Sequence, residues 1–266
     1  MSYIVTDSDM RLGSGLIERD TINVPYGSYA KATANWIDTG IDLIPRAEWP
    51  ARIKAMELSL SRLSDMRNAA EIPSSDQGKE GFCWCYSAAN CLTMIRAKNN
   101  LDFVKLSPHA IGMKIFGRNR GAWGAMAMEF LSTNGCPSEQ FWPLRSTDLN
   151  HDTQLCWDDA KQYTVTEGWM DIDVAAYNRD VTFDQVMTAL LTRTPVVLDY
   201  MWWGHSVTGM DAVELDSSLS LSDPNRWGIR IWNSWGDQWG EDGTGLVVGS
   251  KAIPDGGCIA AAVSGA

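Results

Sequence analysis

Cys83 has the sequence context of a nucleophile. It lies in DQGKEGFCWCYSAANC, residues 76–91, where a glycine-punctuated loop runs directly into an apolar stretch. The spacing of the apolar residues predicts a helix that begins at Cys83, and a helix N-terminus favours a thiolate over a thiol. Gln77 lies upstream and can fold back across the loop, so that its side-chain amide joins the Cys83 N–H as an oxyanion hole. The stretch therefore predicts a thiol nucleophile beside an oxyanion hole.

Two residues further along the chain could complete such a site. His205 opens the segment HSVTGMDAVEL, whose apolar residues predict a strand that starts at the histidine. Asn233 opens the string NSWGDQWGEDG, the most specific motif in the sequence. An imidazole can hold a thiolate as an ion pair and later return the proton, and an amide oxygen can orient that imidazole. We therefore expect Cys83, His205 and Asn233 to lie close together.

Together these regions resemble the papain-like cysteine peptidases. Residues 77–84 are similar to that family's glutamine-to-cysteine loop and Cys-Trp helix start, His205 to its His-Ala-Val strand, and residues 233–236 to its asparagine motif. The similarity extends from about residue 44 to the C-terminus. It implies an α+β papain-like fold with a mainly helical half, an antiparallel β-barrel-like half, and the active cleft between them.

The resemblance also implies a reaction, the thiol-dependent hydrolysis of peptide bonds in a peptide or protein substrate. The implied roles are Cys83 as nucleophile, His205 as proton carrier, Asn233 as the group that orients His205, Gln77 as oxyanion-hole donor, and Trp84 and Trp235 as supporting residues. This chemistry implies no cofactor. A zinc site is disfavoured because one residue separates Cys83 from Cys85 and no second Cys/His pair exists.

The substrate is expected to lie along GAWGAMAMEFLSTNGC, residues 121–136, which resembles the family's glycine shelf and the helix after it. Gly121 occupies one shelf position, but Ala122 stands at the second, where the family usually has glycine. We expect the added methyl group to narrow the approach of an extended peptide backbone.

Two connections depart from the family pattern. Only seven residues separate Val197 from His205, which predicts a more open cleft on that side. The segment between His205 and Asn233 is longer than the family minimum because it contains DSSLSLSDPNR. This loop could overhang the primed side of the cleft or bind a partner.

The chain divides into an N-terminal arm, residues 1–43, and one peptidase domain, residues 44–266. Its helical half is expected to end at about residue 160, with the β-rich half after it. The arm is rich in Gly, Ser, Thr and Asp. A propeptide is the family-based alternative for it, but the arm lacks the long charged helix of the family's inhibitor.

Residues 51–69 have apolar positions at mostly helical spacing and predict one helix.

Charge and cysteine usage restrict the partners and the compartment. The 266 residues carry a formal net charge of −11 with scattered basic residues, which disfavours nucleic acid and membrane partners. No apolar run approaches the roughly 18 residues that span a bilayer, and the first residues lack the apolar core of a secretory signal. Glu80, Lys114 and Asn119 stand where the family usually has bridging cysteines, which favours a reducing compartment. We expect a cytoplasmic protein, or one within a larger particle such as a virion.

Two other functions fit the same pattern. The arm, the missing bridging cysteines and Ala122 suit a structural or interaction protein that retains a peptidase fold in a larger assembly, with the arm as a contact. The same triad also serves other amide-bond enzymes, such as a transpeptidase, a deubiquitinase-like enzyme or a peptidoglycan amidase. Substrate preference depends on residues that are brought together only in space.

Overall fold

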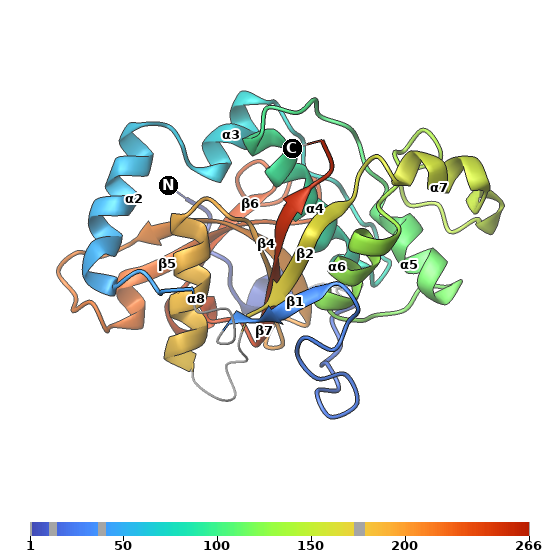
Figure 1. Cartoon of the computed structure of the whole chain (residues 1–266). Helices are drawn as coiled ribbons and strands as arrows, with labels where there is room; N and C mark the ends of the chain where they lie inside the picture. Colours follow the sequence, from blue (N-terminus) through green and yellow to red (C-terminus); the bar gives the residue numbers. More distant parts are fainter. Residues whose placement is uncertain (1, 11–14, 37–40, 173–178, 266) are drawn as a thin grey trace.

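A seven-stranded sheet runs through the middle of the molecule (Figure 1). The computed structural model describes residues 2–10, 15–36, 41–172 and 179–265. The strands are β1 (Ala32–Asn35), β2 (Val165–Asp171), β3 (Val196–Tyr200), β4 (His205–Glu214), β5 (Trp227–Trp232), β6 (Thr244–Val248) and β7 (Gly256–Val263). Their order is β1-β2-β7-β3-β4-β5-β6, and neighbours pair antiparallel except β1 and β2, which are parallel. The predicted antiparallel β-rich half is thus present as a sheet with one parallel edge.

Helices cover both faces of this sheet and create two large hydrophobic cores, and a smaller cluster gathers around Leu63, Met94 and Trp232. The helices are α2 (Trp49–Leu58), α3 (Leu63–Ala69), α4 (Cys83–Lys98), α5 (Pro108–Phe116), α6 (Gly124–Thr133), α7 (Gln154–Ala160) and α8 (Arg179–Leu191). In one core α2 and α8 pack with Val196 and Leu198 of β3, whereas Val197 lies in the other core with α4, α5 and α6. Because successive strand residues face opposite sides, β3 separates the two large cores. The fold class is α+β, as the sequence predicted.

Helix α4 lies at the centre of the molecule. Every residue from Cys83 to Ile95 is buried, so the helix is enclosed on all sides by α6, β4 and the other elements around it. Arg96 and Lys98 occupy its last turn, where positive charge stabilises the carbonyl end. The predicted helix start at Cys83 and its end at Lys98 are confirmed. Neither α4 nor any other described helix is long and apolar enough to cross a bilayer.

The single helix predicted for residues 51–69 is wrong. The chain forms α2 and α3 instead, separated by four residues. Leu60 between them has a φ of +50°, a left-handed conformation that interrupts the helix. The N–H of Ser61 then donates to the Met56 carbonyl (3.0 Å), which closes the end of α2. The apolar residues of both helices have helical spacing, but such spacing carries no signal for the turn between them.

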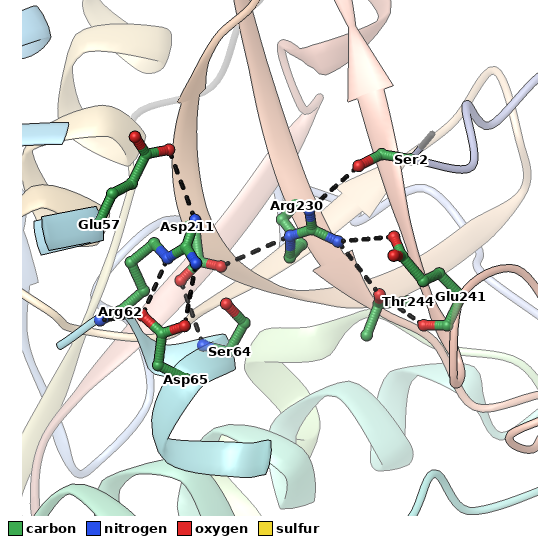
Figure 2. A network of polar contacts seen from close by, with 9 residues as sticks. All are labelled: Ser2, Glu57, Arg62, Ser64, Asp65, Asp211, Arg230, Glu241 and Thr244. Atoms are coloured by element: carbon green, nitrogen blue, oxygen red, sulfur yellow. Dashed lines mark hydrogen bonds and ion pairs between the residues drawn. The ribbon is translucent and has the colours of Figure 1, made fainter. Parts of the chain in front are cut away.

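A polar network fastens α3 to the strands that carry the site (Figure 2). Buried Asp211 of β4 accepts from the Ser64 N–H (3.3 Å) and lies 3.7 Å from Nε of Arg230 on β5. Arg230 reaches on to Glu241 before β6, at 3.4 Å. Because a buried charge is stable only when it is paired, these contacts fix the position of α3 relative to β4, β5 and the segment before β6.

The N-terminal arm crosses the whole sheet. The N–H of Val5 donates to the Leu246 carbonyl (2.9 Å) and the Leu246 N–H to the Tyr3 carbonyl (2.7 Å), so the arm begins beside β6. It ends in β1, which pairs with β2 at the opposite edge (Figure 1). Between these two anchors lie residues 15–27, which pass over the site described next.

Candidate active site

Cys83 is the first residue of α4 and is completely buried. Burial raises the pKa of the Cys83 thiol above its ordinary value, and the nearby charge of Asp199 adds to the rise. The backbone N–H groups of Ser206, Trp84 and Cys83 act in the opposite direction and lower this pKa, but they do not outweigh burial. The helix start therefore supplies the N–H groups that the sequence predicted. The expected preference for a thiolate is wrong for this arrangement, because water does not reach the sulfur.

His205 and Asn233 form a direct hydrogen bond inside the protein. Nε2 of His205 and Oδ1 of Asn233 are 2.7 Å apart, and both residues are fully buried. Asn233 is held by its own N–H, which donates to the Gly243 carbonyl (2.9 Å). An amide oxygen can only accept, so the proton of the neutral imidazole lies on Nε2 and the basic nitrogen is Nδ1.

The start of β4 docks on the N-terminal half of α4, close to Cys83. The hydroxyls of Ser206 and Ser87 are 2.7 Å apart, and the Thr208 hydroxyl donates to the Ser87 carbonyl (3.0 Å). Ser206 follows His205 directly, and its N–H reaches the Cys83 sulfur. The predicted histidine and asparagine are thus bonded to each other, and the residue after His205 contacts the predicted cysteine at the start of α4.

Aromatic rings cover the histidine. Trp235 stacks on the His205 ring with centroids 4.5 Å apart and an interplanar angle of 25°. The edge of Trp203 meets the same ring at 4.9 Å, and Trp239 packs against Trp235 at 5.8 Å. Excluding water lowers the local dielectric and strengthens the hydrogen bond between His205 and Asn233. Trp235 therefore occupies the shielding position that the sequence predicted.

Gln77 is fully buried and is tied to the asparagine segment. Its N–H donates to the Ser234 carbonyl (2.9 Å), and the Ser234 hydroxyl donates to its Oε1 (2.5 Å). These bonds turn the amide nitrogen Nε2 away from Ser234, and one of its two hydrogens goes to the Glu80 carbonyl (2.8 Å). The side chain is held rigidly on the loop that precedes Cys83.

The indole ring of Trp84 connects two segments of the site. Its indole N–H donates to the carbonyls of Gly81 (3.1 Å) and Arg120 (3.3 Å). The first carbonyl belongs to the loop before Cys83 and the second to the residue before the shelf. Trp84 thereby links the nucleophile loop to the shelf at Gly121.

The arm occupies the shelf. The Ala122 N–H donates to the Gly15 carbonyl (3.1 Å), and the Ile17 N–H donates to the Ala122 carbonyl (3.0 Å), so Leu16 and Ala122 form a parallel bridge. The Leu16 N–H also donates to the carbonyl of Gly204, the residue before His205 (3.1 Å). Both backbone groups of the shelf residue are therefore engaged by the chain's own N-terminal segment.

Known proteins similar to this chain are cysteine proteases. No family model matches it. Thiol protease SEN102 of Hemerocallis sp. is 26% identical over 179 residues, which is 63% of this chain and 48% of that protein. The probable cysteine protease RDL2 of Arabidopsis thaliana is 28% identical over 193 residues, which is 66% of this chain and 51% of that protein. The chain is similar in sequence to papain-like cysteine proteases. It spans about half the length of these curated relatives.

The papain-like fold is also found by comparison with solved structures. A digestive procathepsin L2 proteinase from the larval midgut of Tenebrio molitor superposes with a TM-score of 0.60 at 15% identity, covering 98% of this chain and 84% of that one. Xylellain, a cysteine protease from Xylella fastidiosa, gives a TM-score of 0.52 at 20% identity, covering 71% and 82%. Both comparisons concern the fold. All six cysteines of this papain-like chain are free, in line with the missing bridging positions.

Two expectations about the cleft need correction. The Ala122 side chain lies in the core around α4 and α6, so its methyl group does not narrow the shelf, and its backbone pairs with the arm without hindrance. The long loop after β4 does not overhang the cleft. It joins Glu214 to Trp227, at the opposite end of β4 from His205, and a ten-residue strand is about 33 Å long.

Sequence reasoning missed several residues around this papain-like site. Trp203 and Trp239 both donate their indole N–H to Asp9 of the arm, to its carbonyl and its carboxylate respectively, at 3.3 Å each. Asp199, the last but one residue of β3, lies beside Cys83. Its sequence signal was one acid in the apolar run PVVLDY. Within the described residues, no group of three or more His, Cys, Asp and Glu side chains is placed to hold a metal ion.

Proposed function

We propose that this chain is a thiol-dependent peptide-bond hydrolase of the papain type, whose cleft is closed by its own N-terminal arm. The observation that carries the proposal is the junction of α4 and β4. There Cys83 lies at a helix N-terminus, the N–H of Ser206 reaches its sulfur, and the neighbouring His205 is oriented by Asn233. Relatives named as cysteine proteases support the same reading.

The reaction follows from the positions of these groups. His205 takes the Cys83 proton on Nδ1, and the thiolate attacks the carbonyl carbon of a peptide bond. The negative oxygen of the tetrahedral intermediate accepts from the Cys83 N–H and from Nε2 of Gln77, an interaction that contributes about 3 kcal/mol in comparable sites. His205 then protonates the leaving amine as the C–N bond breaks. Water, deprotonated by His205, attacks the thioester, which releases the carboxylic acid and restores the thiol.

The arm has to leave the shelf before a substrate can bind there. Gly15 and Ile17 use the backbone N–H and carbonyl of Ala122, the groups that an extended peptide would need. The same segment also bonds to the carbonyl of Gly204, the residue before His205, and so crosses the site next to the buried Cys83, whose pKa is raised by burial. Displacing the arm would expose the thiol to solvent and return the helix N–H groups to a dominant role. The arm would thereby control access and nucleophilicity together.

Closure of the cleft also favours a second function, that of a structural or interaction protein with a retained peptidase fold. In that case the arm would stay in the cleft or would exchange onto a partner in an assembly. The contacts of the arm with its own β6, shelf and β2 support the hydrolase, because they occupy the arm within one chain. Size-exclusion chromatography with limited proteolysis separates the two readings. A monomer with a protected arm counts against an assembly held by the arm.

The test of the hydrolase is selective labelling of Cys83 together with cleavage of unfolded casein under reducing conditions. We expect iodoacetamide to label Cys83 before the other cysteines, and Cys83→Ala to abolish cleavage without unfolding the protein. Cys91→Ala is the matched control, because Cys91 is equally buried on the same helix but lies about two turns after the helix N-terminus. It should retain cleavage. Labelling of other cysteines with Cys83 unmodified in the native protein would refute the proposal.

A further inference from the structure

A cavity of about 380 Å³ lies beside the proposed catalytic residues. Its walls come from Trp123 and Ala125 after the shelf, from Asp199 and Met201 around the short turn between β3 and β4, and from Asp255 before β7. The described arm covers it with residues 16–19. Cavities of roughly 300–1,000 Å³ are the usual size for ligand pockets. The short connection to His205 thus leaves a pocket on the side where the sequence predicted an open cleft.

The wall of this cavity contains a carboxylate that is incompletely bonded. Asp199 is 8% exposed, and its Oδ2 accepts the Gly124 N–H at 3.1 Å. Its Oδ1 makes no hydrogen bond within normal geometry to the described residues, although the Ser206 hydroxyl lies close enough to act on the carboxylate, whose pKa burial raises and Ser206 lowers. A buried carboxylate oxygen without a donor is unfavourable, so this atom is a ready acceptor for a ligand. Asp255 adds a second carboxylate to the same wall.

Among the described residues, Arg19 of the arm is the one cation that lines this cavity. Its guanidinium donates to the buried Asp171 (2.8 Å) and to the carbonyls of Val24 and Pro25. Arg19 also lowers the pKa of Asp199, which burial raises. When the arm leaves the shelf, Arg19 leaves with it, and Asp171 and Asp199 remain without a cation.

We propose that this cavity binds the cationic side chain of an arginine or lysine in the substrate, with Asp199 as the specificity-determining residue. The inference deepens the proposed hydrolase function and, in naming a substrate class, rests on it. A substrate residue that pairs with Ala122 takes the place of Leu16, which itself lines the cavity. Its side chain then meets Asp199 in the cavity wall, whose charge Arg19 had partly compensated. A guanidinium can donate to a carboxylate through two N–H groups at once, so arginine fits best.

Binding by the full chain tests the cavity without any need for catalysis. The probes are argininamide and citrullinamide, which have nearly the same shape but differ in charge, measured by isothermal titration calorimetry. We expect argininamide to bind at least about tenfold more tightly, a difference of about 1.4 kcal/mol. Asp199→Asn keeps an oxygen for the Gly124 N–H but removes the charge, and it should reduce the preference to about twofold. Asp102→Asn, which removes an exposed acid outside the cavity, should leave the preference unchanged.

Equal affinities for the two probes, no binding of argininamide, or an unchanged preference in Asp199→Asn would each overturn the proposal. Hydrolysis of peptide pairs that differ by arginine or citrulline at one position separates it from the hydrolase proposal. Cleavage of both peptides at equal rates would support the hydrolase proposal and refute the cationic pocket. Selective binding of argininamide without cleavage of any peptide would support the pocket and refute the hydrolase. For each variant, kcat/KM for the arginine peptide is divided by kcat/KM for the citrulline peptide. This ratio is used because Asp199 also acts on the pKa of Cys83, which affects the cleavage of both peptides.

Discussion

The basic nitrogen of His205 is determined by a single neighbour. Asn233 accepts from Nε2 at 2.7 Å, and the stacked Trp235 keeps water from this bond. If the amide is removed, the ring can rotate and can carry its proton on either nitrogen. The orientation of this side chain therefore belongs to the chemistry rather than to substrate binding.

Replacing Asn233 by alanine should lower kcat and leave KM nearly unchanged. We expect a loss of about 100-fold, the lower range for a general acid–base group that is no longer positioned. Steady-state kinetics on a peptide substrate provide the measurement, and Asn150→Ala on the exposed surface is the control. A rise in KM with unchanged kcat would show that Asn233 acts in binding instead.

Alkylation of Cys83 by iodoacetamide should accelerate with pH and reach no plateau below about pH 9. Burial raises the pKa of this thiol above its ordinary value, so the protonated form dominates at neutral pH. The rate constant is measured from about pH 6 to 10 by mass spectrometry of the labelled peptide. A plateau near neutral pH in the unaltered protein would show that the thiolate is already formed.

Residue types and spacing predict Cys83, His205, Asn233 and Gln77 as site residues, and the fold joins His205 to Asn233 by a direct hydrogen bond. Each belongs to a short local motif, and local motifs are visible in a sequence. The role of Asp199 was not visible, because a lone acid in an apolar strand acquires meaning only from the cavity beside it. Trp203 could likewise not be distinguished from the other tryptophans, 13 in all, by sequence. Its contact with the His205 ring depends on the turn before His205.

At the scale of elements, the arm decides the state of the site. Gly15 has a φ of +87°, and a Cβ atom on it would lie 2.3 Å from the Cα atom of Gly81. The close approach of two backbones at this point is possible only with glycine. Any side chain at position 15 must push the arm away from the loop that precedes Cys83.

Gly15→Ala should therefore open the cleft. We expect labelling of Cys83 and peptide cleavage to become at least about tenfold faster, and the alkylation profile to shift to lower pH. Gly117→Ala is the matched control. Gly117 also has a left-handed φ, +64°, but open space surrounds it, so the backbone strain is similar and no clash occurs. Unchanged labelling in Gly15→Ala, or an equal increase in Gly117→Ala, would contradict closure by the arm.

The elements with strong apolar periodicity were predictable and the arm was not. Helix α4 and the strand at His205 bury continuous runs of apolar side chains. The arm is held mainly by backbone hydrogen bonds and by one buried ion pair, Arg19 with Asp171, neither of which leaves a periodic pattern. The break between α2 and α3 depends on the backbone conformation of Leu60, which residue type alone does not favour.

At the scale of the whole molecule, six free thiols are buried in the folded chain. Burial raises the pKa of each above its ordinary value, to about 11 for Cys156. In the unfolded chain these thiols lose their protons near pH 8.5, a usual value for cysteine, so above this pH the folded state holds more protons than the unfolded state. The free energy of unfolding then falls as pH rises.

Urea denaturation under reducing conditions should show this loss of stability between about pH 8 and 10, with a slope of up to about 1.4 kcal/mol per pH unit for each thiol. Below about pH 8 the contribution of the thiols is constant. Removing one thiol, as in Cys136→Ala, should make the slope shallower even though the cavity it leaves lowers stability at neutral pH. A free energy of unfolding that is flat across this range would contradict the assignment of buried, protonated thiols.

The arm is anchored on both sides of the cleft, by residues 3–5 against β6 and by β1 against β2. A blocking segment tethered in this way has an effective concentration in the millimolar range or higher, so dilution does not release it. One cut of the backbone between the anchors would disfavour the closed state, because each piece of the arm could then move away from the cleft while it stays bound at its own edge of the sheet. Activity would rise, although both pieces remain attached to the folded protein and its mass is unchanged.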